Sequence, residues 1–127
     1  MSNSITHFEI YGEEPKKLAL FYRSVFGWEI EQMPGVDYWR IETSAPGNMH
    51  GGLMYRAIAG LNGWMLYINV ESLDKTISEI EGFGGKVIRP KTAVPKTAWV
   101  TIMADPQGNT FGVWQADSTA LPTPEPE

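Results

Sequence analysis

An internal repeat limits the folds open to this chain of 127 residues more than any other feature. At an offset of 60 positions, a Trp, a Pro and a Gly recur in the same order (Trp39, Pro46 and Gly52 with Trp99, Pro106 and Gly112). At an offset of 58, earlier positions match as well (Ile10, Lys17, Gly27 and Ile30 with Ile68, Lys75, Gly85 and Ile88). Two copies of one unit, each about half a domain, predict a single pseudo-symmetric fold with a cleft between its halves.

Hydrophobic periodicity predicts the same order of elements in each half, namely a strand, a helix and three strands. The predicted strands cover 5–11, 28–32, 37–43 and 50–56, then 64–70, 86–89, 98–104 and 110–115; the predicted helices begin at Pro15 and Leu73 and end at Gly27 and at Gly84-Gly85. The predicted fold class is therefore α+β, with two βαβββ modules (4–56 and 64–116) forming a curved mixed sheet and helices outside.

The boundaries of this domain follow from composition. A single domain is expected over 1–116, with a Gly- and Ala-rich linker over 57–63 between the modules. The Pro-rich segment 117–127 has too few apolar residues to fold alone, so we expect a disordered tail.

Composition excludes several function classes. A net charge of −5 argues against nucleic-acid and anionic-membrane partners, which need a basic face. The chain has no cysteine, which excludes disulfides and zinc–thiolate sites, and no apolar run approaches the roughly 20 residues that span a bilayer. Its first residues resemble no secretory signal, so a cytoplasmic location is the default expectation.

Two motifs identify a family resemblance. They are Phe21-Tyr22-Arg23-Ser24-Val25-Phe26-Gly27-Trp28, at the end of the first predicted helix, and Asp105-Pro106-Gln107-Gly108-Asn109, before the last predicted strand. With them, roughly residues 4–116 resemble the vicinal oxygen chelate superfamily, which includes glyoxalase I, extradiol dioxygenases and bleomycin-binding proteins. Segments 7–10, 51–54 and 111–114 are similar, more narrowly, to a glyoxalase-related subgroup. The resemblance implies the fold and a homodimer, but it leaves the reaction open because function lies in the site.

The metal site of the superfamily has four pseudo-equivalent positions, and the resemblance carries them to His7, Gly52, Met65 and Gly112. The repeat agrees, because the offsets relate His7 to Met65 and Gly52 to Gly112. Only the imidazole of His7 can bind a divalent metal of the usual kinds, whereas a catalytic metal needs about three protein ligands. We therefore expect no bound metal and no other cofactor. A rebuilt site of His7, Glu9 and His50 is the alternative, although His50 also fits an exposed loop.

The same positions predict a ligand site. His7 and Glu9 are the candidate catalytic residues, because alternation places them on one face of the first strand, opposite Phe8 and Ile10. Glycine at 52 and 112 is expected to leave the floor of the cleft open. The candidate ligand-binding residues are Gly52, Met54, Met65, Tyr67, Trp99, Met103, Gly112 and Trp114, a lining that suits a planar or apolar small molecule.

Two functions remain open at this level. One is a lyase or isomerase, related to lactoylglutathione lyase, that acts on a small carbonyl compound without the usual metal. His7 would be its general acid or base, with Glu9 or Tyr67 orienting the imidazole or polarising the substrate. The other is metal-free binding of a small molecule, as in bleomycin-binding resistance proteins, which an acidic and Trp-rich cleft favours for a cationic aromatic ligand.

Overall fold

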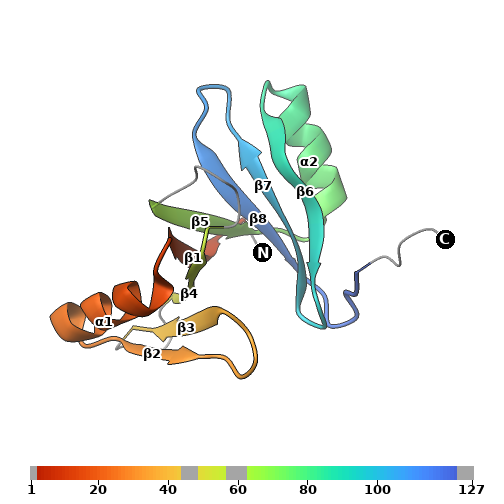
Figure 1. Cartoon of the computed structure of the whole chain (residues 1–127). Helices are drawn as coiled ribbons and strands as arrows, with labels where there is room; N and C mark the ends of the chain where they lie inside the picture. Colours follow the sequence, from red (N-terminus) through yellow and green to blue (C-terminus); the bar gives the residue numbers. More distant parts are fainter. Residues whose placement is uncertain (1–2, 44–48, 57–62, 123–127) are drawn as a thin grey trace. The chain divides into compact units, whose positions relative to one another are not determined.

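The computed structural model describes residues 3–43, 49–56 and 63–122 (Figure 1). The chain divides into two compact units, each of which is described by itself. The N-terminal unit is Thr6–Leu66, and the C-terminal unit is Tyr67–Glu127 together with Met1–Ile5. Residues 57–62 of the predicted linker and residues 44–48 lie outside the described residues, whereas Gly63 belongs to a strand.

The N-terminal unit has the predicted order of strand, helix and three strands. Its elements are β1 (Ile5–Gly12), α1 (Pro15–Phe26), β2 (Glu29–Gln32), β3 (Tyr38–Glu42) and β4 (His50–Tyr55), with hydrogen-bonded order β2-β3-β4-β1. β1 and β4 are parallel, and the other two pairs are antiparallel. The mixed sheet and its helix confirm the predicted α+β class for this half.

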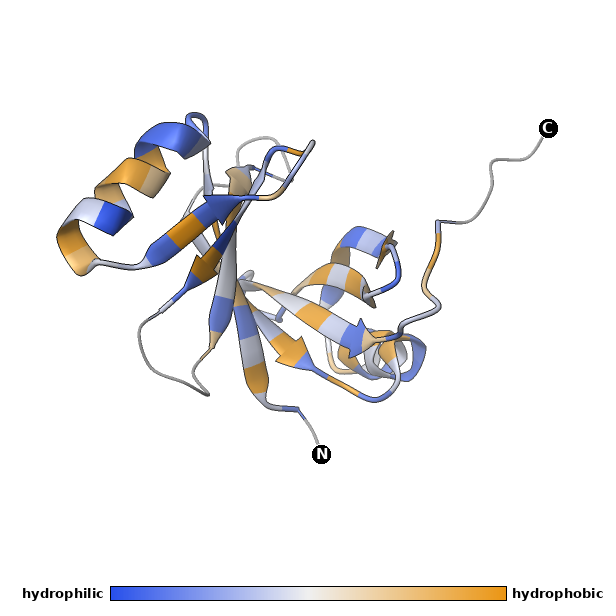
Figure 2. Cartoon of the chain, turned by 90° about the horizontal axis from the view of Figure 1, so that it is seen from below, coloured by the Kyte–Doolittle hydropathy of each residue, from blue (hydrophilic) through white to orange (hydrophobic). Residues whose placement is uncertain are grey.

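Hydrophilic and hydrophobic residues alternate along strands of the sheet (Figure 2), and in β1 this alternation decides which residues enter the core of the unit. Phe8 and Ile10 are buried among residues of α1 and of the neighbouring strands. The buried set is Phe8, Ile10, Ala19, Ile30, Trp39, Ile41 and Leu53. Because side chains alternate along a strand, His7, Glu9 and Tyr11 extend from the other face of β1.

Helix α1 begins at Pro15, which suits the first helical turn, and ends where Gly27 takes a left-handed conformation with φ 69°. The side chain of Arg23 donates two hydrogen bonds to the carbonyl oxygen of Ile30, at 3.0 and 2.6 Å. These bonds tie the end of the helix to β2.

The C-terminal unit repeats the pattern. β5 (Gly63–Asn69) continues into it and is followed by α2 (Leu73–Gly82), β6 (Lys86–Val94), β7 (Ala98–Ala104) and β8 (Thr110–Ala116). The hydrogen-bonded order is β5-β8-β7-β6, in which β5 and β8 are parallel and the other pairs antiparallel. Its core lies between α2 and the sheet and includes Val70, Leu73, Met103 and Val113.

The repeat predicted from sequence corresponds to equivalent places in the two units. The parallel strand pairs align Glu9 with Gly52 in the first unit and Tyr67 with Gly112 in the second. Trp39 and Trp99 each pack against the core beneath a helix. Each unit is therefore one copy of the same βαβββ module.

Two boundaries differ from the sequence-based expectation. β6 extends to Val94 instead of ending near Arg89, because register shifts let it follow β7 for its full length. The expected disordered tail begins at Asp117, but Asp117 donates its N–H to Thr97 at 2.9 Å and Ala120 is fully buried. Backbone hydrogen bonds join this segment to Lys96 and Thr97, in the turn between β6 and β7. Among the described residues, no helix is long and apolar enough to cross a membrane.

Candidate functional site

A row of hydrogen-bonded polar side chains lies on the face of β1 opposite the core. His7 Nε2 is 3.4 Å from Glu9 Oε2, and the Tyr11 hydroxyl donates a hydrogen bond of 2.6 Å to Glu9 Oε1. The side chains of His7 and Glu9 are only 15% and 13% exposed. Both carboxylate oxygens of Glu9 are thus engaged, which holds the carboxylate beside the imidazole. The two predicted catalytic residues lie together.

The neighbouring strands bring further side chains to this face. In the register of the sheet, Gly52 of β4 lies between Glu9 of β1 and Arg40 of β3. A Cβ atom added to Gly52 would collide with the hydroxyl and ring of Tyr38. The phenol of Tyr38 therefore lies directly over the glycine, next to the Glu9 strand. Only glycine permits this close approach of a ring to the backbone.

The environment of Tyr38 keeps its phenol neutral. Burial raises the pKa of Tyr38 well above its ordinary value of 10.0, and the negative charge of Glu9 raises the pKa further. The positive charge of Arg40 acts in the opposite direction and is the smallest of the three effects. A desolvated phenol beside a carboxylate remains a hydrogen-bond donor throughout the physiological range of pH.

An exposed group of charges borders the row. Arg40 Nη2 lies 3.0 Å from Glu42 Oε1, and His50 Nδ1 lies 3.8 Å from the same oxygen. The side chain of His50 is 62% exposed. His50 is the first residue of β4, paired with Glu42 of β3, and not a loop residue. Within the described residues, no group of three His, Cys, Asp or Glu side chains could hold a metal ion.

Met54 and Met65 complete the predicted residues of the N-terminal unit. Met54, on β4, is aligned with Tyr11 of β1 and Tyr38 of β3, so it follows Gly52 on the same face. Met65, on β5, is fully buried.

In the C-terminal unit, Tyr67, Gly112 and Trp114 form a second cluster. A Cβ atom added to Gly112 would collide with the ring of Tyr67, which is buried. The edge of the Tyr67 ring meets Trp114, with ring centroids 6.4 Å apart. The expectation of an open floor above the two glycines is wrong, because a tyrosine ring fills the space over each of them.

Trp99 and Met103 lie on the other face of β7, beneath α2. Met103 is fully buried in the core cluster, and Trp99 packs against it. Trp99 Nε1 donates to Asp117 Oδ2 at 3.0 Å, and Lys91 Nζ lies 4.7 Å from the centre of the ring. This corrects the expectation that both residues share a face with Gly112 and Trp114. The physical reason is strand parity, since odd-numbered residues of β7 face the helix.

The residues at the four metal positions of the superfamily do not fit a metal. These positions hold one imidazole, one thioether and two glycines (His7, Met65, Gly52 and Gly112). In addition, the space over Gly52 and over Gly112 is occupied by the rings of Tyr38 and Tyr67. Divalent metals of the usual kinds need about three nitrogen or oxygen ligands from protein, and this set supplies one.

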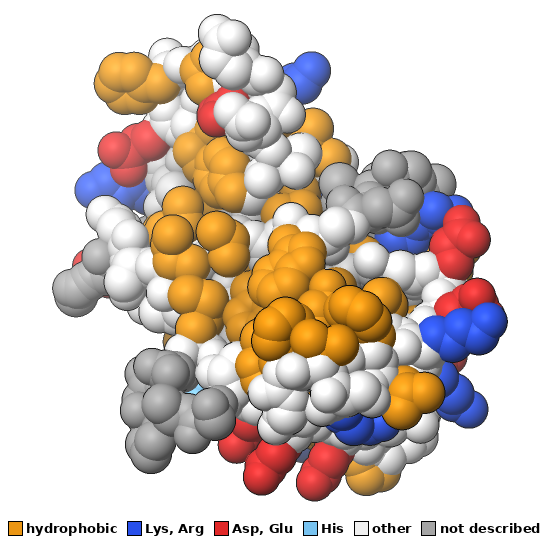
Figure 3. Space-filling view, turned by 90° about the vertical axis from the view of Figure 1, so that its left-hand side faces the viewer, with side chains coloured by type: hydrophobic (Ala, Val, Ile, Leu, Met, Phe, Trp, Pro, Cys, Tyr) orange, Lys and Arg blue, Asp and Glu red, His pale blue; other side chains and the backbone are white. Residues whose placement is uncertain are grey.

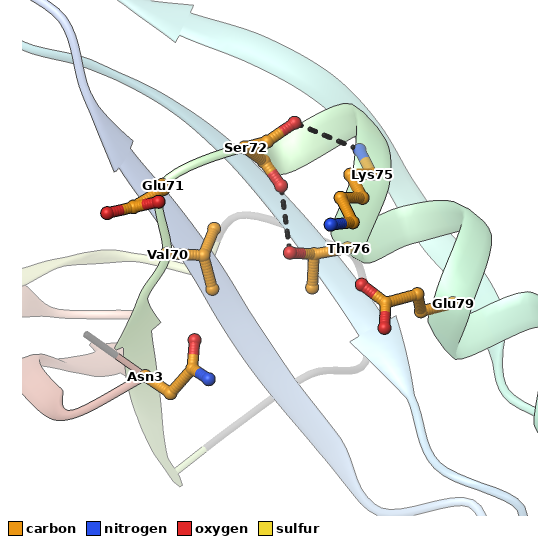
Figure 4. A pocket seen from close by; sticks show the side chains of 7 residues that line it. All are labelled: Asn3, Val70, Glu71, Ser72, Lys75, Thr76 and Glu79. Carbon is orange, nitrogen blue, oxygen red and sulfur yellow. Dashed lines mark hydrogen bonds between the residues drawn. The ribbon is translucent and has the colours of Figure 1, made fainter. Parts of the chain in front are cut away.

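Each unit also has a hollow at the start of its helix. The hollow at α2, about 400 Å³, is lined by Asn3, Val70, Glu71, Ser72, Lys75, Thr76 and Glu79 (Figure 4). The hollow at α1, about 550 Å³, is lined by Glu13, Glu14, Pro15, Lys16, Lys17, Asp37, Trp39 and Tyr55. The offset of 58 relates three residues that line the hollow at α1 to three that line the hollow at α2: Glu13 to Glu71, Glu14 to Ser72 and Lys17 to Lys75. Ser72 accepts a hydrogen bond from the N–H of Lys75 at 3.2 Å, as an N-cap does.

The chain belongs to the glyoxalase-like domain family, whose model matches residues 8–114. Among curated proteins, "Putative glyoxylase CFP32" of Mycobacterium tuberculosis is 27% identical over 117 residues, which cover 76% of this chain. The protein of the same name from Mycobacterium bovis matches equally well. The match spans only 40% of the length of these relatives.

Solved structures agree on the fold. The hypothetical protein BH1468 of Bacillus halodurans is similar at a TM-score of 0.66 with 17% identity, covering 95% of this chain and 99% of that one. The methylmalonyl-CoA epimerase of Mycobacterium tuberculosis has a TM-score of 0.63 with 13% identity, covering 91% and 89%. At these identities the likeness concerns the fold alone. The predicted membership of the vicinal oxygen chelate superfamily is confirmed.

Sequence reasoning missed Tyr38, Arg40 and the role of Tyr11 at this face. Alternation alone could have placed residues 38, 40 and 42 on one face of their strand. The pairing of that face with Glu9 and Gly52 depends on the register of three strands, which periodicity does not provide.

Proposed function

We propose that this chain is a glyoxalase-related enzyme that moves a proton next to the carbonyl group of a small molecule, a lyase- or isomerase-type reaction. The observation that carries the proposal is the row of His7, Glu9 and Tyr11 on β1. An imidazole 3.4 Å from a carboxylate, with both side chains nearly buried, is an arrangement suited to general acid–base catalysis.

The proposed roles follow from the contacts. His7 is the base that removes the proton, because imidazoles exchange protons near neutral pH. Glu9 orients the imidazole and stabilises the imidazolium that forms, at 3.4 Å. Tyr11 fixes Glu9 through its hydrogen bond of 2.6 Å. No step in this scheme passes through a metal, because the donor set does not fit one.

Hydrogen–deuterium exchange tests this proposal. Small α-hydroxyketones, 2-oxoaldehydes and acyl thioesters are incubated with the protein in D2O, and loss of the proton next to the carbonyl is followed by NMR. We expect exchange with at least one compound, and a rate about 10²-fold lower in His7→Gln and Glu9→Gln, a usual loss for general acid–base catalysis. His50→Gln is the matched control, because that imidazole is 62% exposed. Unchanged exchange in His7→Gln contradicts the proposal.

Metal-free binding of a small molecule is the second candidate. It is favoured by the acidic side of the same sheet face, where Glu29, Glu31 and Glu42 surround Arg40 in a hollow of about 120 Å³. Such a face suits a cationic ligand rather than an anionic one. Native mass spectrometry of freshly purified protein checks for a co-purified molecule. A bound cationic aromatic compound together with no exchange activity would favour binding over catalysis.

The proposal includes three further features. The ligand contacts Met54 and the phenol of Tyr38 that covers Gly52, near His7. The protein is cytoplasmic, in keeping with its lack of cysteine. It acts as a homodimer, for which the exposed apolar side chains of α1 provide a surface (Figure 3).

A further inference from the structure

We propose that the Tyr38 hydroxyl is a catalytic group that donates a hydrogen bond to the carbonyl oxygen of the small molecule. This assignment deepens the proposed function and rests on it. It identifies the ligand as a carbonyl compound with a hydrogen on the adjacent carbon, whose oxygen becomes negatively charged when that hydrogen leaves as a proton.

The position of the phenol supports this role. Tyr38 lies over Gly52, and Gly52 is aligned with Glu9 on the neighbouring strand. The hydroxyl is therefore next to the row that holds His7. β3 is covered on its other side by the core residues Trp39 and Ile41.

The hydroxyl has a proton to donate. Within the part of the chain that the structure describes, it makes no hydrogen bond, whereas the hydroxyl of Tyr11 is already bonded to Glu9. Burial and the charge of Glu9 raise the pKa of Tyr38, so the phenol stays neutral. A neutral O–H aimed at a developing oxyanion in a partly desolvated place is a strong form of transition-state stabilisation.

The charges balance in this scheme. His7 takes the proton from the carbon next to the carbonyl, and the electron pair of the C–H bond forms the C=C bond of an enolate. The electron pair of the C=O π bond moves onto the oxygen. The imidazolium of His7 is then paired with Glu9, and the enolate oxygen accepts the hydrogen bond from Tyr38. Return of a proton to the carbon restores all groups and gives exchange or inversion at that carbon.

Arg40 adds to this electrostatic setting. It is aligned with Gly52 on the side opposite Glu9, and its positive charge acts on the phenol of Tyr38. The oxyanion would thus lie between a neutral donor and a nearby cation. Glu42, which contacts Arg40 at 3.0 Å, partly offsets that charge.

Tyr38→Phe tests the assignment, because it removes one oxygen and keeps the ring over Gly52. In the exchange assay we expect a kcat about 10²-fold lower with KM nearly unchanged, as for loss of one oxyanion donor. Tyr55→Phe is the matched control, because Tyr55 is an exposed tyrosine of β4. Gly52→Ala is a second variant: its Cβ must displace the Tyr38 hydroxyl, so it should reproduce the loss with the phenol still present.

A binding measurement separates this assignment from the proposed reaction. Propane-2-nitronate is a small anion shaped like an enolate, and 2-nitropropane is its neutral form. By calorimetry, we expect the wild-type protein to prefer the anion, and Tyr38→Phe to bind the anion about tenfold more weakly, the loss expected for a hydrogen bond to a charged group. Circular dichroism verifies that each variant is folded.

The outcomes are distinct. Equal nitronate affinity in wild type and Tyr38→Phe, or no nitronate binding at all, overturns the role of Tyr38, even if His7→Gln still abolishes exchange. Weaker nitronate binding in Tyr38→Phe and Gly52→Ala, with no exchange for any compound, supports Tyr38 as an oxyanion donor and contradicts the enzyme proposal.

Discussion

At the scale of single residues, the two repeated glycines leave space that tyrosine rings fill, and not space for a ligand. Gly52 allows the phenol of Tyr38 to reach the backbone of β4, and Gly112 allows the ring of Tyr67 to do the same on β8. The first contact leaves a hydroxyl at the candidate site. The second ring is buried and packs on Trp114, so it contributes to the core of its unit.

Gly112→Ala should therefore lower stability. The added methyl group collides with the buried Tyr67 ring, and overpacking of this kind costs about 1 to 3 kcal/mol. Urea denaturation followed by Trp fluorescence measures the free energy of unfolding. Gly82→Ala is the control, because a Cβ at that helical position meets no atom within 4 Å. Equal stability of Gly112→Ala and wild type would contradict the packing. Gly112→Leu should destabilise further, because its larger side chain meets the same ring.

At the scale of elements, the turn between β7 and β8 is organised by one carboxylate. Asp105 Oδ1 accepts hydrogen bonds from the N–H groups of Gln107 and Asn109, at 2.9 and 3.0 Å. The side-chain amide of Asn109 donates to Oδ2 at 2.9 Å. These bonds lower the pKa of Asp105 below its ordinary value of 3.8, those of Asn109 most. The motif that marks the family is thus a structural turn.

Asp105→Ala should lower the melting temperature at pH 7, and the difference from wild type should shrink in acid. Because the folded-state pKa is lowered, the stabilisation is present above about pH 3.8 and is lost as the pH falls through the lower folded-state value. Calorimetric melts of both proteins from pH 7 to pH 3 measure the difference in melting temperature. Asp74→Ala, which removes an exposed partner of Lys91, is the control and should change little. A gap that stays constant in acid would count against this account.

At the scale of the whole molecule, helix α1 has exposed apolar side chains in addition to those that pack into the core of the N-terminal unit. Leu18, Ala19 and Tyr22 face the core, whereas Phe21, Val25 and Phe26 are more than half exposed. The ring of Tyr22 stacks on Trp28 at 5.5 Å, which continues this aromatic region to β2. Exposed apolar patches of this kind commonly mark protein–protein contacts.

Light scattering should give twice the chain mass of 14.2 kDa, if a second copy covers this face. Phe26→Glu should shift the mass to that of one chain and leave the circular dichroism spectrum unchanged, because the side chain is already 58% exposed. Phe83→Glu is the control, as Phe83 is 85% exposed at the end of the other helix. A monomeric wild type refutes the dimer, and a dimeric Phe26→Glu refutes this face.

The sequence by itself determined the order of elements, the repeat and the face on which His7 and Glu9 lie. These follow from local rules, namely side-chain alternation in strands, helical spacing and the residues that start and end helices. The same rules placed Phe8 and Ile10 in the core, and the repeat related Gly52 to Gly112. Parity could also have separated Trp99 and Met103 from Trp114, had strand register been known.

Only the tertiary structure decided which side chains of neighbouring strands contact one another. The register of β1, β4 and β3 brings Tyr38 over Gly52 and beside Glu9, although these residues are far apart in the chain. Register depends on packing of the whole sheet face and shifts side chains between faces in steps of one residue. For that reason the sequence predicted open space over the two glycines, whereas in the folded protein a tyrosine ring packs against the backbone at each of them.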